Sequence, residues 1–242
     1  MKIKFLGTSF GAPSIGRHQQ SILLETDRGN SYLFDAGAPV LDILVNENYD
    51  LTKIKAVFLS HMHGDHINGI FDIIYLSQYF QMKYDMLLPD AKGMEFLKSY
   101  LKLQHMENCD LISFKEIKES VFFNDGNIKV SAVSTNHINK AKGNSYGFII
   151  EADGKKTYIS GDLHSSLNDF PKFSEDESIE LAIVECAHFS PESLFQKLEE
   201  VKINQVAVVH VMPPEKYDDL RSCIKPLTWK IHLPADGDVI EI

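Results

Sequence analysis

The chain of 242 residues is 44% hydrophobic and 24% charged, which excludes an intrinsically disordered protein and is typical of a globular fold with a substantial core. Its formal net charge of −10 disfavours long nucleic acids as partners, because affinity for the phosphate backbone depends on many Lys and Arg contacts. No apolar run approaches the roughly 20 residues that span a bilayer, and no linker divides the chain. We therefore expect a single domain of residues 1–242 and no membrane partner.

The N-terminus indicates where the protein resides. Residues 1–6 alternate like a strand and lead into a glycine turn, and they lack the longer apolar region and small-residue cleavage site of a signal peptide. Three cysteines, Cys109, Cys186 and Cys223, lie far apart without a CxxC pair, which suits free thiols in a reducing compartment. We therefore expect a cytoplasmic protein.

Short runs rich in β-branched and aromatic residues recur along the chain and predict strands. Segments with helical periodicity lie between several of them, and Ser190 followed by Pro191 is a helix-start signal. The mixture predicts an α/β fold in which sheets are sandwiched between helices. The predicted strands are 2–6, 20–25, 31–34, 55–60, 84–88, 128–134, 146–151, 156–160, 180–185, 205–211 and 228–233, and the clearest predicted helices are 38–46, 67–82, 91–104 and 191–202.

The segment 67–82 carries apolar residues at helical spacing. We interpret it as one helix that packs on a sheet. Its aromatic residues leave an alternative open, in which they form a homodimer contact or line a substrate pocket.

The sequence His61-Met62-His63-Gly64-Asp65-His66 places four candidate metal ligands in six residues, at the end of the predicted strand 55–60. A loop at a strand end is held by the sheet and stays open to solvent, as a catalytic metal requires. Roughly one chain in a thousand of this composition would show the pattern by chance. The motif therefore favours a metal site over unliganded loop histidines.

Three further polar residues, His137, Asp162 and His210, also end strand-like runs. Each alone could be a buried polar group with ordinary hydrogen bonds, but with the first loop they make seven candidate ligands for a two-metal site. Two cations that share a carboxylate and a water supply a hydroxide nucleophile near neutral pH. Nitrogen and oxygen ligands suit Zn²⁺ first and also admit Mn²⁺ or Fe²⁺. Two such ions would make the site mouth positive, which suits a small anionic substrate.

The motif SHMHGDH, followed by His137, Ser160-Gly161-Asp162 and His210, resembles the metallo-β-lactamase superfamily, whose HxHxDH loop is its most specific signature. The resemblance covers essentially the whole chain and implies a four-layer αββα sandwich, with two mixed sheets flanked by helices and the metals at one edge. True β-lactamases typically have a cysteine at the position of Asp162, so that branch is disfavoured. The resemblance assigns the first metal to His61, His63 and His137, the second to Asp65, His66 and His210, and a bridging role to Asp162.

Two segments resemble ribonuclease Z and the cyclic-phosphate phosphodiesterases of phosphonate breakdown. One is the glycine-rich opening 7–14, which a tight turn explains equally well. The other is the segment with Glu185 and His188 before a predicted helix; the resemblance makes His188 a catalytic acid or phosphate contact. Glu185 would orient His188, and Asp65 would orient the hydroxide. Nothing between Asp162 and Glu185 is long enough for the glycine- and proline-rich arm with which ribonuclease Z grips transfer RNA.

The sequence thus predicts a binuclear metal-dependent hydrolase, specifically a phosphodiesterase that acts on a small phosphodiester or nucleotide by a metal-bridging hydroxide. A thioester or lactone hydrolase similar to glyoxalase II would keep the same ligands, and a non-catalytic metal-binding module is a third hypothesis. Turnover of a model diester distinguishes the module from the enzymes. Arg17 and His18 could contact a substrate phosphate or be solvated loop residues, and His164 could reach the site or lie on a surface loop.

Overall fold

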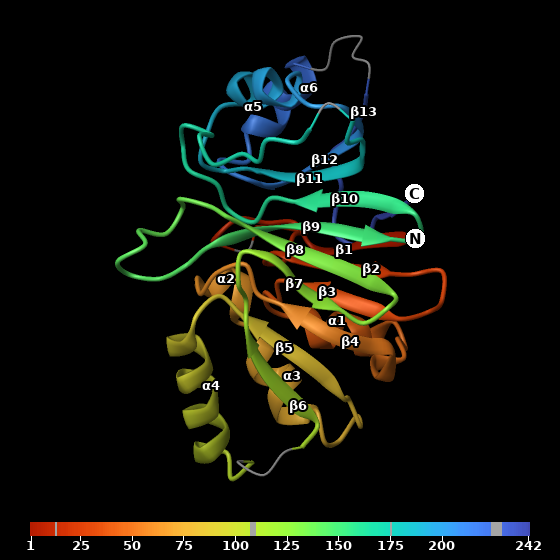
Figure 1. The fold of residues 1–242 in the computed structure, drawn as a ribbon, viewed down its shortest axis with the longest axis vertical. Helices are drawn as coiled ribbons and strands as arrows, with labels where there is room; N and C mark the ends of the chain where they lie inside the picture. Colours follow the sequence, from red (N-terminus) through yellow and green to blue (C-terminus); the bar gives the residue numbers. More distant parts are fainter. Residues whose placement is uncertain (13, 107–109, 175, 224–228) are drawn as a thin grey trace.

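Two mixed β-sheets pack face to face, and helices cover the outer face of each sheet (Figure 1). This is the four-layer αββα arrangement that the sequence predicts. The computed structural model describes residues 1–12, 14–106, 110–174, 176–223 and 229–242. Cys109 and the first residue of the predicted strand 228–233 lie outside these ranges.

The first sheet combines antiparallel and parallel strands. Its order is β14-β1-β2-β3-β4-β5-β6; the pairs from β14 to β3 are antiparallel, and those from β3 to β6 are parallel. The strands are β1 (Lys2–Gly7), β2 (Ser21–Glu25), β3 (Ser31–Phe34), β4 (Ile54–Phe58), β5 (Tyr84–Leu88), β6 (Ile112–Glu116) and β14 (Val239–Glu241).

The second sheet follows the same plan. Its order is β13-β12-β11-β10-β9-β8-β7; the pairs from β7 to β10 are antiparallel, and those from β10 to β13 are parallel. The strands are β7 (Ser120–Asn124), β8 (Ile128–Ser134), β9 (Tyr146–Ala152), β10 (Lys155–Ile159), β11 (Ile179–Cys186), β12 (Ile203–Val211) and β13 (Lys230–His232).

The helices divide between the two outer faces, as Figure 1 shows. The helix-start signal at Ser190 is present, since its hydroxyl oxygen accepts a hydrogen bond from the Ser193 amide at 3.2 Å and Pro191 occupies the first turn. The first sheet is covered by α1 (Val40–Asn46), α3 (Ile70–Leu76) and α4 (Ala91–Leu103), and the second by α5 (Pro191–Leu198) and α6 (Lys216–Cys223); η1 (Leu51–Lys53) and α2 (Gly64–Ile67) are short.

Three apolar clusters correspond to the three interfaces between the layers. The cluster between the sheets is rich in aromatic rings: Phe34 stacks on Phe58 with centroids 4.8 Å apart, and Phe58 meets Phe123 of the other sheet edge-to-face at 5.1 Å. The other two clusters lie between each sheet and its helices. The pleat sends alternate side chains to opposite faces, so strands covered on both sides are apolar almost throughout.

The predicted single helix over 67–82 is wrong. The chain forms α2 and α3 instead, and the break falls at Asn68 and Gly69. Gly69 donates a backbone hydrogen bond to Ala36 at 2.8 Å, and a Cβ there would lie 2.5 Å from Val40 Cγ1. The helix is therefore interrupted where its backbone lies against the neighbouring loop. Tyr79, just beyond α3, is 80% exposed, and the homodimer alternative stays a prediction.

Five other observed elements, β6, β7, β14, α6 and the short η1, were not predicted, and α5 ends at Leu198 rather than at residue 202. In the part of the chain that the structure describes, every helix is too short or too polar to cross a lipid bilayer.

Candidate metal centre

All seven candidate ligands lie together at one end of the sandwich. His61 and His63 follow β4, while Asp65 and His66 lie in α2. The second sheet contributes the other three, because His137 follows β8, Asp162 follows β10, and His210 lies near the end of β12. Both sheets therefore contribute to the centre.

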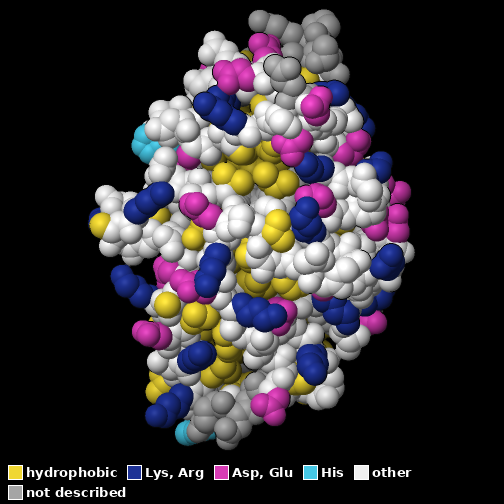
Figure 2. Space-filling model, in the orientation of Figure 1, with side chains coloured by type: hydrophobic (Ala, Val, Ile, Leu, Met, Phe, Trp, Pro, Cys, Tyr) yellow, Lys and Arg dark blue, Asp and Glu magenta, His cyan; other side chains and the backbone are white. Residues whose placement is uncertain are grey.

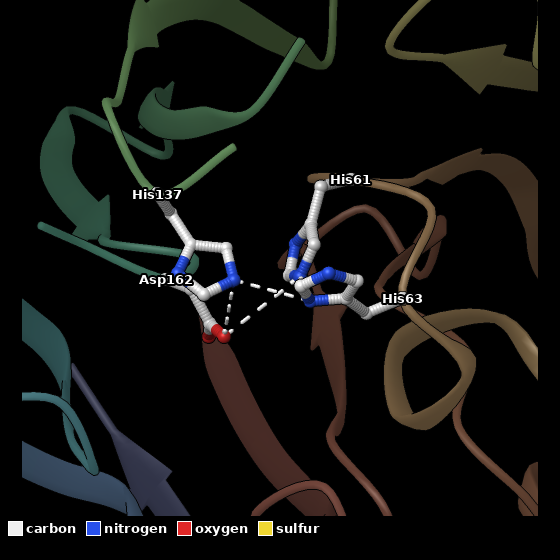
Figure 3. Close-up of side chains that lie close together, drawn as sticks. All are labelled: His61, His63, His137 and Asp162. Atoms are coloured by element: carbon white, nitrogen blue, oxygen red, sulfur yellow. Dashed lines mark hydrogen bonds and ion pairs between the residues drawn. The ribbon is translucent and has the colours of Figure 1, made fainter. Parts of the chain in front are cut away.

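The first ligand group contains His61, His63, His137 and Asp162, whose side chains converge in Figure 3. His63 Nδ1 lies 3.0 Å from His61 Nε2 and 3.1 Å from His137 Nε2. Asp162 Oδ2 lies 3.8 Å from His61 Nε2 and 3.5 Å from His137 Nε2. Ring nitrogens and a carboxylate oxygen thus face one small volume.

The second group contains Asp65, His66 and His210. Asp65 Oδ2 lies 3.0 Å from His210 Nε2 and 3.4 Å from His66 Nε2. His210 is the extra residue at a shift in register between β11 and β12, where its φ is 50°. A β-bulge of this kind turns a side chain away from the regular alternation, which explains how His210 reaches the site.

Asp162 lies between the two groups. Its Oδ2 faces His61 and His137, while its Oδ1 lies 3.4 Å from His66 Nε2 and 3.8 Å from His210 Nδ1. Gly161 before it has a φ of 56°, and a Cβ there would lie 2.5 Å from the Tyr146 carbonyl oxygen. The Ser160-Gly161-Asp162 turn needs this glycine, and the turn directs the Asp162 carboxylate toward both groups.

The histidines of the first group are uncharged at neutral pH. Burial lowers the pKa of His61 well below its ordinary value, and nearby imidazoles add to the effect. Burial also lowers the pKa of His63, and it lowers the pKa of His137 to about 4. A neutral imidazole has the free lone pair that a metal ion requires.

The second group has a different charge balance. Burial raises the pKa of Asp65, but the hydrogen bond from His210 and the His66 imidazole beside it outweigh burial and hold the pKa well below its ordinary value. Burial lowers the pKa of His66, but Asp162 and Asp35 raise it well above its ordinary value. Burial likewise lowers the pKa of His210, while Asp162 and Asp65 raise it. These carboxylates therefore favour positive charge in a buried site.

Three of the eight buried side-chain atoms that have no hydrogen-bond partner among the described residues, His66 Nε2, Asp162 Oδ1 and His210 Nδ1, test whether a metal fits. Orphaned buried polar atoms are rare in folded proteins and call for an unseen water or ion. All three belong to the two ligand groups and carry lone pairs that divalent metals accept. The residues present fit two metal ions.

Asp35, at the end of β3, belongs to the site although the sequence analysis missed it. Its Oδ2 lies 2.7 Å from His66 Nδ1, and its two oxygens accept hydrogen bonds from the Ser60 amide at 2.7 Å and the Ser60 hydroxyl at 2.9 Å. A carboxylate on the far nitrogen of a ligating imidazole fixes the ring orientation and its tautomer. The signal that identified Asp162, a polar residue at a strand end, would also have identified Asp35.

Glu185 and His188 form a pair beside both ligand groups. Glu185 is 1% exposed, and its Oε1 lies 2.8 Å from His188 Nδ1. The His188 ring lies 4.6 Å from that of His137 and 6.1 Å from that of His210, between centroids. The hydrogen bond to Glu185 raises the pKa of His188 above its ordinary value. The pair can therefore hold a proton at the edge of the site.

Lys216, at the start of α6, fixes the turn that carries His188. Its Nζ donates to the backbone carbonyls of Cys186 at 3.1 Å, Ala187 at 3.0 Å and Phe189 at 2.8 Å. Glu185 binds the same turn from the other side, since its Oε2 accepts the Ala187 amide at 2.7 Å. Nothing in the sequence indicated Lys216, because its partners lie about 30 residues away.

Three further residues that the sequence singled out, Arg17, His18 and His164, make contacts outside the two ligand groups. Arg17 donates to the Pro234 carbonyl at 2.9 Å and packs on a tyrosine ring, so it is not a freely solvated loop residue. The His18 amide donates to Asp236. His164 is exposed, lies 2.8 Å from Ser166 Oγ through Nδ1, and lines a hollow beside His137.

Known proteins share this fold. The metallo-beta-lactamase fold protein YhfI from Bacillus subtilis superposes with a TM-score of 0.82 at 21% identity, covering 99% of this chain and 98% of that one. Human tRNase Z, short form, superposes with a TM-score of 0.74 at 19% identity, covering 100% of this chain and 99% of that one. These likenesses confirm the predicted fold class.

Comparison of sequences shows which proteins of this fold the chain is similar to. A ribonuclease Z from Listeria innocua serovar 6a is 31% identical over 140 residues, which are 57% of this chain but only 46% of that protein. The resemblance to the ribonuclease Z branch of the metallo-β-lactamase superfamily is therefore confirmed. The family described as Anti-Pycsar protein Apyc1 matches residues 1–221, which are most of the chain. The chain belongs to the Anti-Pycsar protein Apyc1 family.

Proposed function

We propose that this protein is a binuclear metal-dependent phosphodiesterase that acts on a small phosphodiester or nucleotide. The observation that carries the proposal is the position of His188, held by a buried carboxylate at the edge of both ligand groups. The similarity to ribonuclease Z supports phosphodiester chemistry.

Two divalent ions suit the seven donors, with Zn²⁺ as first choice and Mn²⁺ or Fe²⁺ as alternatives. Such a pair, when bound, supplies a hydroxide nucleophile near neutral pH and offsets charge on the phosphoryl oxygens. Asp65 stays ionised, so its carboxylate can accept a hydrogen bond and orient the attacking water. The ligands would be His61, His63 and His137 for one ion and Asp65, His66 and His210 for the other, with Asp162 between them.

His188 would protonate the leaving group. Its Nδ1 is engaged by Glu185, so Nε2 is the nitrogen that can pass a proton to the departing oxygen. An alkoxide is a strong base and gains much from this proton, whereas a thiolate is a weaker base and gains less. The pair therefore favours a phosphodiester with an alkoxide leaving group over the thioester alternative.

One face of the molecule and the connection that packs on the second sheet support a small substrate. Lys and Arg side chains are interspersed with Asp and Glu over the face in Figure 2, without a continuous basic patch. Leu163, Leu167 and Phe170, on the connection from β10 to β11, are buried against the second sheet. This connection follows the sheet instead of extending as an arm.

The test is whether the loss of hydrolysis rate in His188→Ala depends on the leaving group of the substrate. Bis-p-nitrophenyl phosphate releases a stable phenolate, whereas a nucleoside 3′,5′-cyclic monophosphate releases a sugar alkoxide. We expect wild type and variant to bind two metals per chain. The hydrolysis rate of the variant should fall by less than about tenfold for the substrate that releases the phenolate, and by about 100-fold or more for the substrate that releases the alkoxide. His232→Ala, on edge strand β13, is the matched control and should leave both rates unchanged.

Other outcomes identify the alternatives. Hydrolysis of a thioester or a lactone without diester turnover would replace the proposal with an acyl hydrolase. Two metals with no turnover of these substrates or of a transfer RNA precursor would indicate a metal-binding module. An equal loss for both leaving groups would show that His188 is not the acid.

A further inference from the structure

A hollow lies between the first loop and the start of α6, and no step proposed above uses it. Its volume is about 340 Å³, within the range of small-molecule sites. We call it the Arg17–Tyr217 cavity. Two serines line it together with Ile15, Arg17, Val211, Pro214 and Tyr217.

The cavity adjoins the second ligand group. Val211 in its wall directly follows His210, and Ser9 directly follows Thr8, whose carbonyl accepts the His210 amide at 3.0 Å. On the same loop, a Cβ at Gly11 would lie 3.9 Å from Asp65 Oδ2. A substrate phosphate between the ligand groups could therefore extend a substituent into this cavity.

One wall is a cation stacked on an aromatic ring. The Arg17 guanidinium carbon lies 4.4 Å from the centroid of the Tyr217 ring. Its Nη1 donates to the Pro234 carbonyl at 2.9 Å and to the Thr8 hydroxyl, so its orientation is fixed. A guanidinium held in this way can stack on a flat aromatic ligand as well as attract an anion.

Two further features suit an organic ligand with a polar edge. The Tyr217 hydroxyl oxygen is buried and has no hydrogen-bond partner among the described residues, and such an atom normally has one. Ile15 is fully exposed at the tip of the first loop, where an apolar side chain gains nothing until something covers it. A ligand ring would cover Ile15, and an atom at the ring edge would pair with the hydroxyl.

We infer that the Arg17–Tyr217 cavity is a subsite for a planar aromatic group of the substrate, with hydrogen-bonding atoms at its edge as a nucleobase has. The inference deepens the proposed function and rests on it for the phosphate position. An alkyl chain would not stack on the guanidinium and would leave the Tyr217 hydroxyl without a hydrogen-bond partner, and a sugar would leave Ile15, Val211 and Pro214 without apolar contact. A flat heterocycle would contact the apolar side chains with its ring, stack on the guanidinium and pair with the hydroxyl at its edge.

The experiment measures the dissociation constants of phenyl phosphate and methyl phosphate by calorimetry with the metal-loaded protein. Wild type should bind phenyl phosphate about tenfold more tightly, since one stacked ring contributes about this much. Ile15→Ser removes a fully exposed side chain and so leaves the fold intact; Tyr217→Leu removes the ring. Either variant should bring the preference below about threefold and change methyl phosphate binding by less than about twofold. The control Leu103→Ser, also at an exposed apolar position, should change neither constant.

A fall in the preference in either variant, with methyl phosphate binding unchanged, supports the subsite. The inference is overturned if wild type shows no preference, if the preference survives in both variants, or if both ligands weaken equally. Because the readout is binding, failure of diester hydrolysis would refute the proposed function without deciding the subsite.

Discussion

Asp35 acts on the centre through His66, although it belongs to neither ligand group. Its carboxylate fixes the His66 ring from the side away from the other ligands and is itself held by Ser60. Outer carboxylates of this kind tune affinity by keeping the ligand preorganised.

We predict that Asp35→Asn weakens metal binding about 10- to 100-fold, because the amide keeps the shape but loses the charge that orients His66. Competition with a chromophoric chelator measures the change. Asp42→Asn, an exposed carboxylate on α1, is the control. Equal metal affinity in Asp35→Asn and wild type would refute the role.

Lys216 positions the turn that carries His188. Lys216→Met keeps the length of the side chain but leaves three carbonyls without their donor. We predict a loss of about 1–3 kcal/mol in the free energy of unfolding and a rate defect that is larger for the alkoxide than for the phenolate leaving group. Urea denaturation and the two-substrate comparison measure these effects, with Lys197→Met as control. A defect equal for both leaving groups would mean that Lys216 only stabilises the fold.

At the level of single residues, the sequence indicated candidate ligands that stand at strand ends, because a polar residue ending an apolar run has no packing reason to be there. It could not identify Lys216, whose hydrogen-bond partners lie about 30 positions away, or the contact between Arg17 and Tyr217, which are 200 positions apart. Such pairs leave no local pattern.

At the level of elements, the missed strands share a physical cause. β6, β7 and β14 are the edges of their sheets, and each has exposed side chains along most of its length. Edge strands are covered less than central ones, so they lack the continuous apolar run that marks a buried strand. The central strands of both sheets were predicted for the opposite reason.

The turn between β7 and β8 carries a link between the two sheets. Asp125 there accepts a hydrogen bond from the Tyr32 hydroxyl of β3 at 2.5 Å and from the amides of Asn127 and Ile128 at 2.8 and 3.0 Å. Burial raises the pKa of Asp125, but these hydrogen bonds outweigh it and place the pKa below its ordinary value of 3.8. The carboxylate therefore stabilises the fold fully above that ordinary value, and this contribution disappears as the pH falls through the lowered pKa.

We predict that Asp125→Asn lowers the free energy of unfolding at pH 7 by about 1–2 kcal/mol. The difference from wild type should shrink as the pH falls below about 4, because the wild-type carboxylate takes up a proton and, like the amide, no longer carries a charge. Urea denaturation in the presence of a chelator measures both conditions, and Asp72→Asn is the exposed control. A difference that stays constant with pH would show that the charge of Asp125 is unimportant.

On the scale of the whole molecule, the two sheets share one plan, antiparallel strands followed by parallel ones. The candidate ligands come from segments at one end of both sheets. Ligand sites in sheets with parallel strands commonly lie beyond the carboxyl ends of the strands. The positions of the candidate ligands at strand ends were therefore enough to predict that they lie close together, while the cavity beside them depends on how the first loop and α6 meet.

Because each ligand group draws on both sheets, bound metals would cross-link the halves of the sandwich. A metal ion that binds only the folded state, at a free concentration about 1,000 times its dissociation constant, adds about 4 kcal/mol to the free energy of unfolding. For a chain of this size that corresponds to roughly 10 °C in the unfolding temperature. We predict that a chelator lowers the transition by about this amount in wild type and in His232→Ala, and by much less in His137→Ala, which lacks a ligand from the second sheet. A transition unchanged by chelation, in protein shown to release two ions, would mean that the interface between the sheets needs no metal and that the seven residues are arranged for chemistry alone.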